Sequence, residues 1–205
     1  MDILENIFGS NSKVKIIKLF LFNHESVYGV GEVADRAKVS RTVAKREIIN
    51  LENASFLKPR SFSKEVKIQR DRKIVFGHKK AEGWMLDYKF PYLEAVYNFF
   101  SELSVFNPKD LENRLSKAVK VQLLIISGLF IKNADSRVDL LIVGDGVKED
   151  TLETIIKNIE SEIGREIKYA VFETSEFKYR LSVFDKLIRD ILDYPHEKIV
   201  NKLGI

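Results

Sequence analysis

One stretch, residues 30–54, restricts the possible folds more than any other part of the chain. It reads VGEVADRAKVSRTVAKREIINLENA, and apolar residues recur at helical spacing on both sides of Val39–Ser40. Ser40 is of a residue type that begins helices by accepting a backbone N–H two or three residues further on. The stretch therefore predicts two short amphipathic helices that are joined by a tight turn.

The second predicted helix has one apolar face and one basic face. Its buried side holds Val43, Ala44, Ile48 and Leu51. Its outward side holds Arg41, Thr42, Lys45 and Arg46. Two short helices with a tight turn and a basic outer face predict a helix-turn-helix, whose second helix enters the major groove of DNA. An ordinary helical hairpin with a solvated basic face is the alternative.

Positive charge is concentrated in the part of the chain that contains these helices. The net charge of the whole chain is +4. Residues 1–75 hold 15 Lys or Arg against 9 Asp or Glu, residues 76–110 hold 4 against 5, and residues 111–205 hold 15 against 16. This distribution favours a polyanion-binding module joined to a nearly neutral remainder.

The segment after the two helices, LKPRSFSKEVKIQRDRKIVF, has the composition of a β-hairpin. We expect strands at Leu57–Ser61 and Lys64–Phe76, with a turn near Ser61–Ser63. Basic residues crowd this segment: Lys58, Arg60, Lys64, Lys67, Arg70, Arg72 and Lys73. Such a hairpin predicts the wing of a winged helix, which contacts phosphates and positions the protein on DNA. An exposed edge strand protected by lysines is the alternative.

Residues 77–109 form an aromatic-rich connector. Aromatic side chains beside a basic module can stack on nucleic-acid bases. Residues 91–103, however, place Leu93, Val96, Tyr97 and Phe100 on one face of a helix, which is typical of a core or of a dimer interface. We therefore expect a connector that packs the two halves together and supports self-association.

The second half, residues 110–205, alternates between predicted helices and strands. The expected order is helix 110–118, strand 121–130, strand 137–145, helix 152–163, strand 166–172 and helix 175–194. This order predicts a small α/β sheet domain.

Composition excludes several classes of site. The chain has no cysteine, so disulfides, thiol catalysis and cysteine metal sites are excluded, and its three histidines are scattered. The start, MDILENIF, lacks the pattern of a secretory signal, and no apolar run is long enough to span a bilayer. We expect a cytoplasmic protein without a membrane partner.

The chain resembles winged-helix transcriptional regulators that carry a C-terminal minimal nucleotidyltransferase-like domain. The resemblance covers residues 1–76 and 110–205, and SRVDLLIVGD followed by GREIKYAVFETSEF carries it most clearly. It implies an α+β protein, in which a winged helix of three helices and a hairpin wing is joined to a small α/β nucleotidyltransferase-like domain.

Enzymatic members of that family carry a Gly-Ser pair and an Asp-x-Asp pair, whose carboxylates hold two divalent cations. This chain has Ser127-Gly128 at the first place and Arg137-Val138-Asp139 at the second. One carboxylate beside a guanidinium is a poor site for two Mg²⁺ ions. We therefore expect an inactive domain without catalytic residues, metal or cofactor. Asp139 would instead pair with Arg137 or accept hydrogen bonds from nearby backbone.

These features together predict a sequence-specific regulator that binds double-stranded DNA as a homodimer. Arg41, Thr42 and Lys45 would lie nearest the base edges. The phosphate contacts would come from Ser40, Arg46, Lys58, Arg60, Lys64 and Lys67. The C-terminal domain would support dimerisation, or would sense a small molecule or nucleotide in a remnant cleft at Ser127, Gly128, Arg137 and Asp139. A metal-dependent nucleotidyltransferase and an antitoxin-like protein-interaction module are the alternatives.

Overall fold

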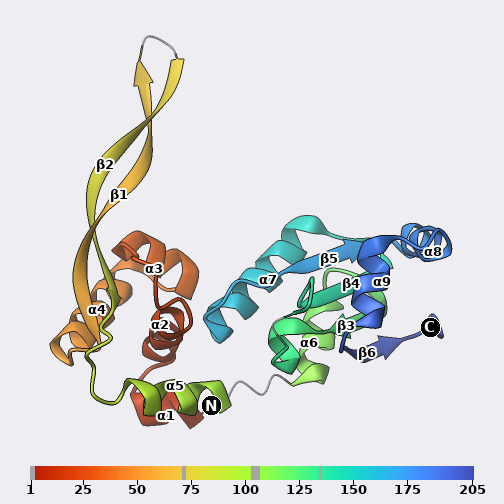
Figure 1. Cartoon of the computed structure of the whole chain (residues 1–205), viewed down its shortest axis with the longest axis horizontal. Coiled ribbons are helices and arrows are strands. Elements are labelled where there is room, and N and C mark those ends of the chain that lie inside the picture. Colours follow the sequence, from red (N-terminus) through yellow and green to blue (C-terminus); the bar gives the residue numbers. More distant parts are fainter. Residues whose placement is uncertain (1–2, 71–72, 103–106, 134) are drawn as a thin grey trace. The chain divides into compact units, whose positions relative to one another are not determined.

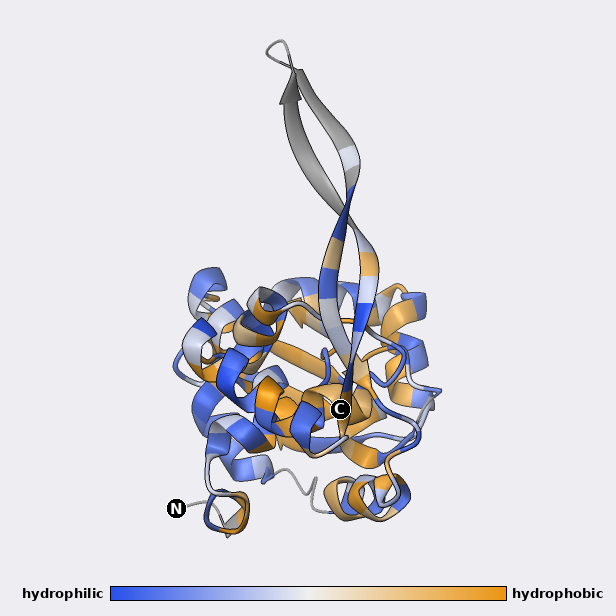
Figure 2. Ribbon diagram, turned by 90° about the vertical axis from the view of Figure 1, so that its left-hand side faces the viewer, coloured by the Kyte–Doolittle hydropathy of each residue, from blue (hydrophilic) through white to orange (hydrophobic). Residues whose placement is uncertain are grey.

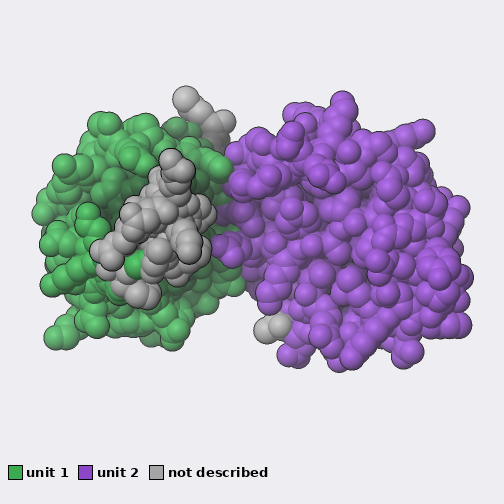
Figure 3. Space-filling model, turned by 90° about the horizontal axis from the view of Figure 1, so that it is seen from above, with its two compact units in different colours: residues 1–103, 161–165 green, residues 104–160, 166–205 purple. Residues whose placement is uncertain are grey.

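The computed structural model describes residues 3–70, 73–102, 107–133 and 135–205, without the side chains of residues 3, 64–70, 73–76 and 78. The chain is α+β and forms two compact units, which Figure 3 colours separately. Unit 1 comprises residues 1–103 and 161–165, and unit 2 comprises residues 104–160 and 166–205. None of the helices in the described ranges combines the length and apolarity that a membrane span requires.

Unit 1 consists of helices followed by a long hairpin and a further helix (Figure 1). Its elements are α1 (Ile3–Phe8), α2 (Asn11–Phe22), α3 (Val30–Ala37), α4 (Arg41–Asn53), β1 (Leu57–Arg70), β2 (Lys73–Leu86) and α5 (Leu93–Glu102). The two helices that the sequence predicts around Val39–Ser40 are thus present as α3 and α4.

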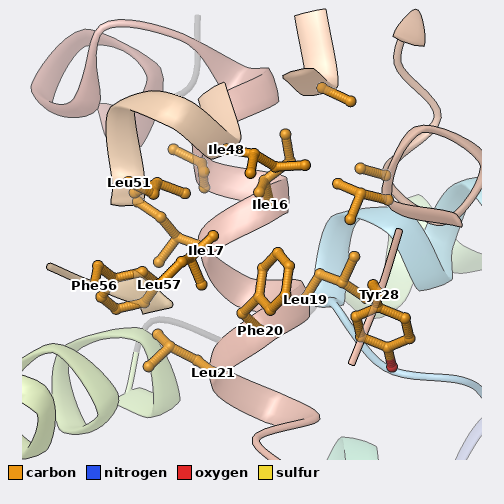
Figure 4. Close-up of a cluster of buried hydrophobic side chains, with 14 of the residues drawn as sticks. Ile16, Ile17, Leu19, Phe20, Leu21, Tyr28, Ile48, Leu51, Phe56 and Leu57 are labelled. Atoms are coloured by element: carbon orange, nitrogen blue, oxygen red, sulfur yellow. The ribbon is translucent and has the colours of Figure 1, made fainter. Parts of the chain in front are cut away.

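The core of unit 1 is built around α2, as Figure 4 shows. Three of its side chains, Ile16, Phe20 and Leu21, have no exposed surface. They pack with Ile48 of α4 and with Leu57 at the start of β1. Burial of this apolar face, at about 25 cal/mol per Å², is the main force that holds α2 in the unit.

The hairpin is longer than the sequence predicts. Phe62, in the expected turn, is paired with Ala81 in a continuous antiparallel ladder, and the chain reverses between Arg70 and Lys73. The turn predicted near Ser61–Ser63 is therefore wrong, and the predicted end of the second strand at residue 76 is ten residues too early. Ser-Phe-Ser contains no residue that requires a turn, so nothing interrupts the ladder there.

A third stretch of extended backbone joins the base of this hairpin. Tyr28, between α2 and α3, forms an isolated antiparallel bridge with Trp84 of β2. Each of the two residues donates its N–H to the carbonyl of the other at 2.9 Å. Gly83 permits this approach, because a Cβ there would lie 2.8 Å from the Tyr28 carbonyl oxygen.

Unit 2 is a four-stranded sheet with helices. Its elements are α6 (Pro108–Leu115), β3 (Lys120–Ile126), the short 3₁₀ helix η1 (Gly128–Ile131), β4 (Leu140–Asp145), α7 (Glu149–Ile163), β5 (Tyr169–Phe172), α8 (Thr174–Ser182), α9 (Lys186–Asp193) and β6 (Glu197–Asn201). The last residues of α7 belong to unit 1. The strand order is β5-β4-β3-β6, in which β4 and β5 are parallel and the other neighbours are antiparallel.

Both faces of the two central strands, β3 and β4, are buried. Leu123 of β3 packs with Phe177 of α8 and with Ile188 of α9, while Leu124 and Ile142 are also fully buried. A strand covered on both faces is apolar along its whole length rather than alternating. This explains the continuous apolar runs of β3 and β4, and Figure 2 shows hydrophobic colour in the interior strands.

The end of unit 2 differs from the prediction of one helix over residues 175–194. The chain breaks at Val183–Asp185 and forms α8 and α9 instead, with Phe184 in the left-handed region at φ 57°. Asp185 begins α9, where its carboxylate accepts the N–H of Leu187 at 2.9 Å. Strand β6, which the sequence analysis does not predict, follows and pairs with β3.

Candidate nucleic-acid interface and nucleotide cleft

The turn between α3 and α4 occupies three residues. Lys38 ends α3 in the left-handed conformation, and its N–H donates to the carbonyl of Ala34. Ser40 begins α4, where its hydroxyl oxygen accepts the N–H of Val43 at 3.3 Å. The predicted cap is therefore confirmed, and the first turn of α4 has a fixed start.

The three residues predicted to contact bases lie in the first two turns of α4. Arg41, Thr42 and Lys45 are exposed, while Ala44 and Ile48 have no exposed surface. The Arg41 guanidinium extends toward α3, where Gly31 leaves room for it. Within the described ranges neither Arg41 nor Lys45 takes part in a salt bridge, and both residues are exposed.

Arg46, a predicted phosphate contact, is held by a carboxylate of the same helix. Its Nη2 lies 2.9 Å from Oε1 of Glu47, whose side chain is only 5% exposed. Lys13 of α2 approaches the other oxygen of Glu47 at 3.8 Å. The Arg46 guanidinium therefore helps to balance a buried negative charge, which restricts its reach toward a ligand.

The base of the hairpin offers further basic groups. Lys58 donates to the Asp87 carboxylate at 3.2 Å, whereas Arg60 is exposed and has no ion pair in the described part of the chain. Lys79 and Lys80 of β2 are exposed as well, and the sequence analysis missed them because it ended the wing at residue 76. Residues 77–83 read GHKKAEG and show no apolar alternation, so no local signal extends the second strand to Leu86.

Two predicted wing residues, Lys64 and Lys67, have side chains outside the described residues. Their backbones belong to β1 and pair with Lys79 and Phe76. At the other end of the hairpin, the Trp84 indole N–H donates to the Glu52 carboxylate of α4 at 2.8 Å. The hairpin is thus fixed beside α4 by this bond and by the bridge to Tyr28.

In unit 2 the structure brings together three of the four predicted cleft residues. The Ser127 hydroxyl donates to the Val138 carbonyl at 2.5 Å, and the Ser136 hydroxyl accepts the Gly128 N–H at 3.0 Å. The Asp139 carboxylate accepts the N–H of Leu129 at 2.7 Å through Oδ1. Its Oδ2 accepts the N–H of Lys168 at 2.8 Å.

Asp139 therefore fastens the loop after β3 to the segment before β5. Of the two arrangements that the sequence left open for Asp139, the structure shows the hydrogen bonds from backbone. Arg137 forms a salt bridge with Asp190 of α9 instead, with its Nε 3.0 Å from a carboxylate oxygen. No local pattern indicated that pair, since its members are far apart in the sequence.

Among the described residues no three His, Asp or Glu side chains lie close enough together to hold a metal ion. Comparison of the chain with protein-family models, with curated proteins and with solved structures finds no match.

Proposed function

We propose that this chain is a regulator that binds double-stranded DNA through a winged helix in unit 1. The observation that carries the proposal is the outward side of α4, where Arg41, Thr42 and Lys45 are exposed directly after a three-residue turn. A recognition helix presents donors for base edges from its first turns in this way.

The hairpin supports the same proposal. Residues 57–86 contain nine Lys or Arg against three Asp or Glu. Each strand has 14 residues, which corresponds to a ribbon of about 45 Å. Such a basic ribbon fits the phosphate backbone of DNA.

The contacts within unit 1 rank the proposed phosphate ligands. Arg60 is exposed and unpaired among the described residues, so it is available to a phosphate without loss of an internal contact. Arg46 and Lys58 would first have to leave Glu47 and Asp87. The Ser40 hydroxyl already accepts a backbone N–H, but its own proton is free to be donated. Among the proposed ligands whose side chains are described, Arg60 should therefore contribute most.

We further propose that the regulator binds a two-fold DNA site as a homodimer. In this proposal unit 2 is a nucleotidyltransferase-like domain without catalytic activity that serves dimerisation or the sensing of a ligand. The support is the geometry of Asp139, because both of its oxygens accept backbone N–H groups. A carboxylate with this role is poorly placed to bind Mg²⁺ as well.

The first test is fluorescence anisotropy of a labelled random-sequence duplex at about 50 and about 200 mM salt. If six or more phosphates are neutralised, affinity should fall roughly a thousandfold between these concentrations, because bound counterions are released from DNA. Binding with that salt dependence would be followed by selection of the preferred site. Absence of binding at the lower salt would refute the regulator and direct the search to an acidic protein partner.

The second test addresses catalysis. With ATP and Mg²⁺ we expect no release of pyrophosphate, from the unmodified protein or from the Asp139→Asn variant. Release that Asp139→Asn abolished would establish the metal-dependent nucleotidyltransferase instead. Circular dichroism at the assay temperature must show that the variant is folded, because Asp139 also has the structural role described above.

A further inference from the structure

Unit 1 contains a cavity of about 440 Å³ on the side of α5. The loop after α2, the end of β2, the segment that follows it and α5 all contribute to its lining. Leu21 and Leu86, which are almost fully buried, contribute to its apolar surface. Its volume lies in the range of sites that bind small organic molecules.

Three aromatic rings of this lining are held in place by contacts with neighbouring side chains or backbone. The Tyr88 hydroxyl is hydrogen-bonded to His24, with its oxygen 2.9 Å from Nδ1 and 3.1 Å from the backbone carbonyl oxygen. Phe90 packs edge-on against Phe56, with ring centroids 5.4 Å apart. Tyr97 packs in the same way against Phe22 at 5.9 Å. The aromatic walls are therefore formed before any ligand arrives, which lowers the entropy cost of binding.

Glu94 gives the cavity its charge. Among the described residues that line the cavity it is the one acidic side chain, and the lining contains no Lys or Arg. Glu94 is exposed in the first turn of α5 and takes part in no salt bridge within the described ranges. The cavity thus combines aromatic rings, an apolar floor and an unpaired negative charge.

We propose that this cavity binds a small organic cation with an apolar body. Aromatic faces attract cations through their quadrupoles, and an unpaired carboxylate adds direct attraction to the same charge. The apolar floor would receive the hydrocarbon part of the ligand. An anion of the same size and shape would meet the Glu94 charge and should be rejected.

Isothermal titration calorimetry of the full chain tests the proposal with two probes that differ in charge alone. Tetraphenylphosphonium should bind, and tetraphenylborate, its anionic counterpart in size and shape, should bind at least about tenfold more weakly. Glu94→Gln should weaken the binding of tetraphenylphosphonium about tenfold, which corresponds to about 1.4 kcal/mol. Glu102→Gln, the same change on the same helix outside the cavity lining, should leave binding unchanged.

Three results would overturn the proposal. They are absence of tetraphenylphosphonium binding, equal affinity for tetraphenylborate, and equal effects of the two glutamate substitutions. A cavity covered by a second copy of the chain or by another protein would give the first of these results. None of these measurements uses DNA, so their failure is distinguishable from failure of the proposed regulator.

Discussion

We expect replacement of Gly128 to destabilise unit 2, for two reasons. Its φ is +52°, a conformation that costs an L-residue roughly 1–2 kcal/mol. A Cβ at this position would also overlap the Asp139 carboxylate. The hydrogen bonds that Asp139 accepts from the N–H groups of Leu129 and Lys168 therefore depend on the absence of a side chain here.

We expect Gly128→Ala to destabilise unit 2 by more than about 3 kcal/mol, because backbone strain is added to the loss of charge-assisted hydrogen bonds. Gly146→Ala is the matched control, since Gly146 has a φ of +66° but no atom within 4 Å of its Cβ position. The control should cost about 1–2 kcal/mol. Urea unfolding measures both, and equal losses would contradict the role assigned to the Asp139 contact.

For single residues, the sequence predicts candidate positions better than it predicts the partners that their side chains contact. The sequence predicts Asp139 as a residue of a remnant cleft, but it leaves two partners for the carboxylate open. The choice depends on the backbone of Lys168, which only the pairing of β4 with β5 brings into reach. The pair of Arg137 with Asp190 likewise depends on the position of α9.

Among the elements, the hairpin determines the predicted response to salt. The Lys64→Ala/Lys67→Ala double variant should weaken DNA binding and lower the slope of log affinity against log salt by about 1 for each lysine. Lys117→Ala/Lys120→Ala, in exposed positions of unit 2, is the control and should leave the slope unchanged. An unchanged slope in the first variant would refute the assignment of β1 and β2 as a wing.

Helix α9 depends on a charged cap. The N–H groups of Ile188 and Leu187 and the Arg180 guanidinium hold the pKa of the Asp185 carboxyl below its ordinary value of 3.8. A lowered pKa stabilises the folded state fully above about pH 4, and this contribution is lost as the pH falls through the folded-state pKa.

Asp185→Asn should therefore lower the melting temperature at about pH 6, and the difference from the unmodified protein should shrink towards about pH 2. Asparagine begins helices about as well as aspartate, so the substitution isolates the charge. Asp193→Asn, at the other end of α9, is the control and should show no such pH dependence. A difference that stayed constant with pH would contradict the role of the Asp185 charge.

Local signals predicted some elements well and others poorly. The Ser40 cap and the apolar spacing of residues 30–54 predicted α3 and α4 at their observed positions. The break between α8 and α9 was missed because neither Val183 nor Phe184 is a glycine or a proline. The helix-capping residue Asp185 is the one local signal for the start of α9. Strand β6 was missed because five residues near the end of the chain form a strand only through pairing with β3.

For the whole molecule, each of the two units has a buried cluster of its own. Phe20 belongs to the cluster of unit 1 and Phe177 to that of unit 2, and neither has exposed surface. Phe20→Ala and Phe177→Ala should each cost about 3–5 kcal/mol. In differential scanning calorimetry we expect the two variants to lower two different transitions, and a shift of the same transition by both would contradict the division into two units.

The division into two units agrees better with the distribution of charge along the sequence than with the domain boundaries predicted from the sequence. Unit 1 holds 19 Lys or Arg against 14 Asp or Glu, whereas unit 2 holds 15 against 16. The predicted connector over residues 77–109 is not a separate part, since the end of β2 and α5 both belong to unit 1. Sequence spacing located α5 but contained no information about the unit to which it would attach.

The bridge between Tyr28 and Trp84 also has a consequence for the order of folding. Pairs within the hairpin close short loops near its reversal at Arg70 and Lys73, whereas this bridge joins residues that are far apart in the sequence. Contacts between distant residues form more slowly, because a larger loop must be closed. We therefore expect β1 and β2 to pair with each other early in folding. The bridge between Tyr28 and Trp84 should form later, after the helical core has brought Tyr28 into position.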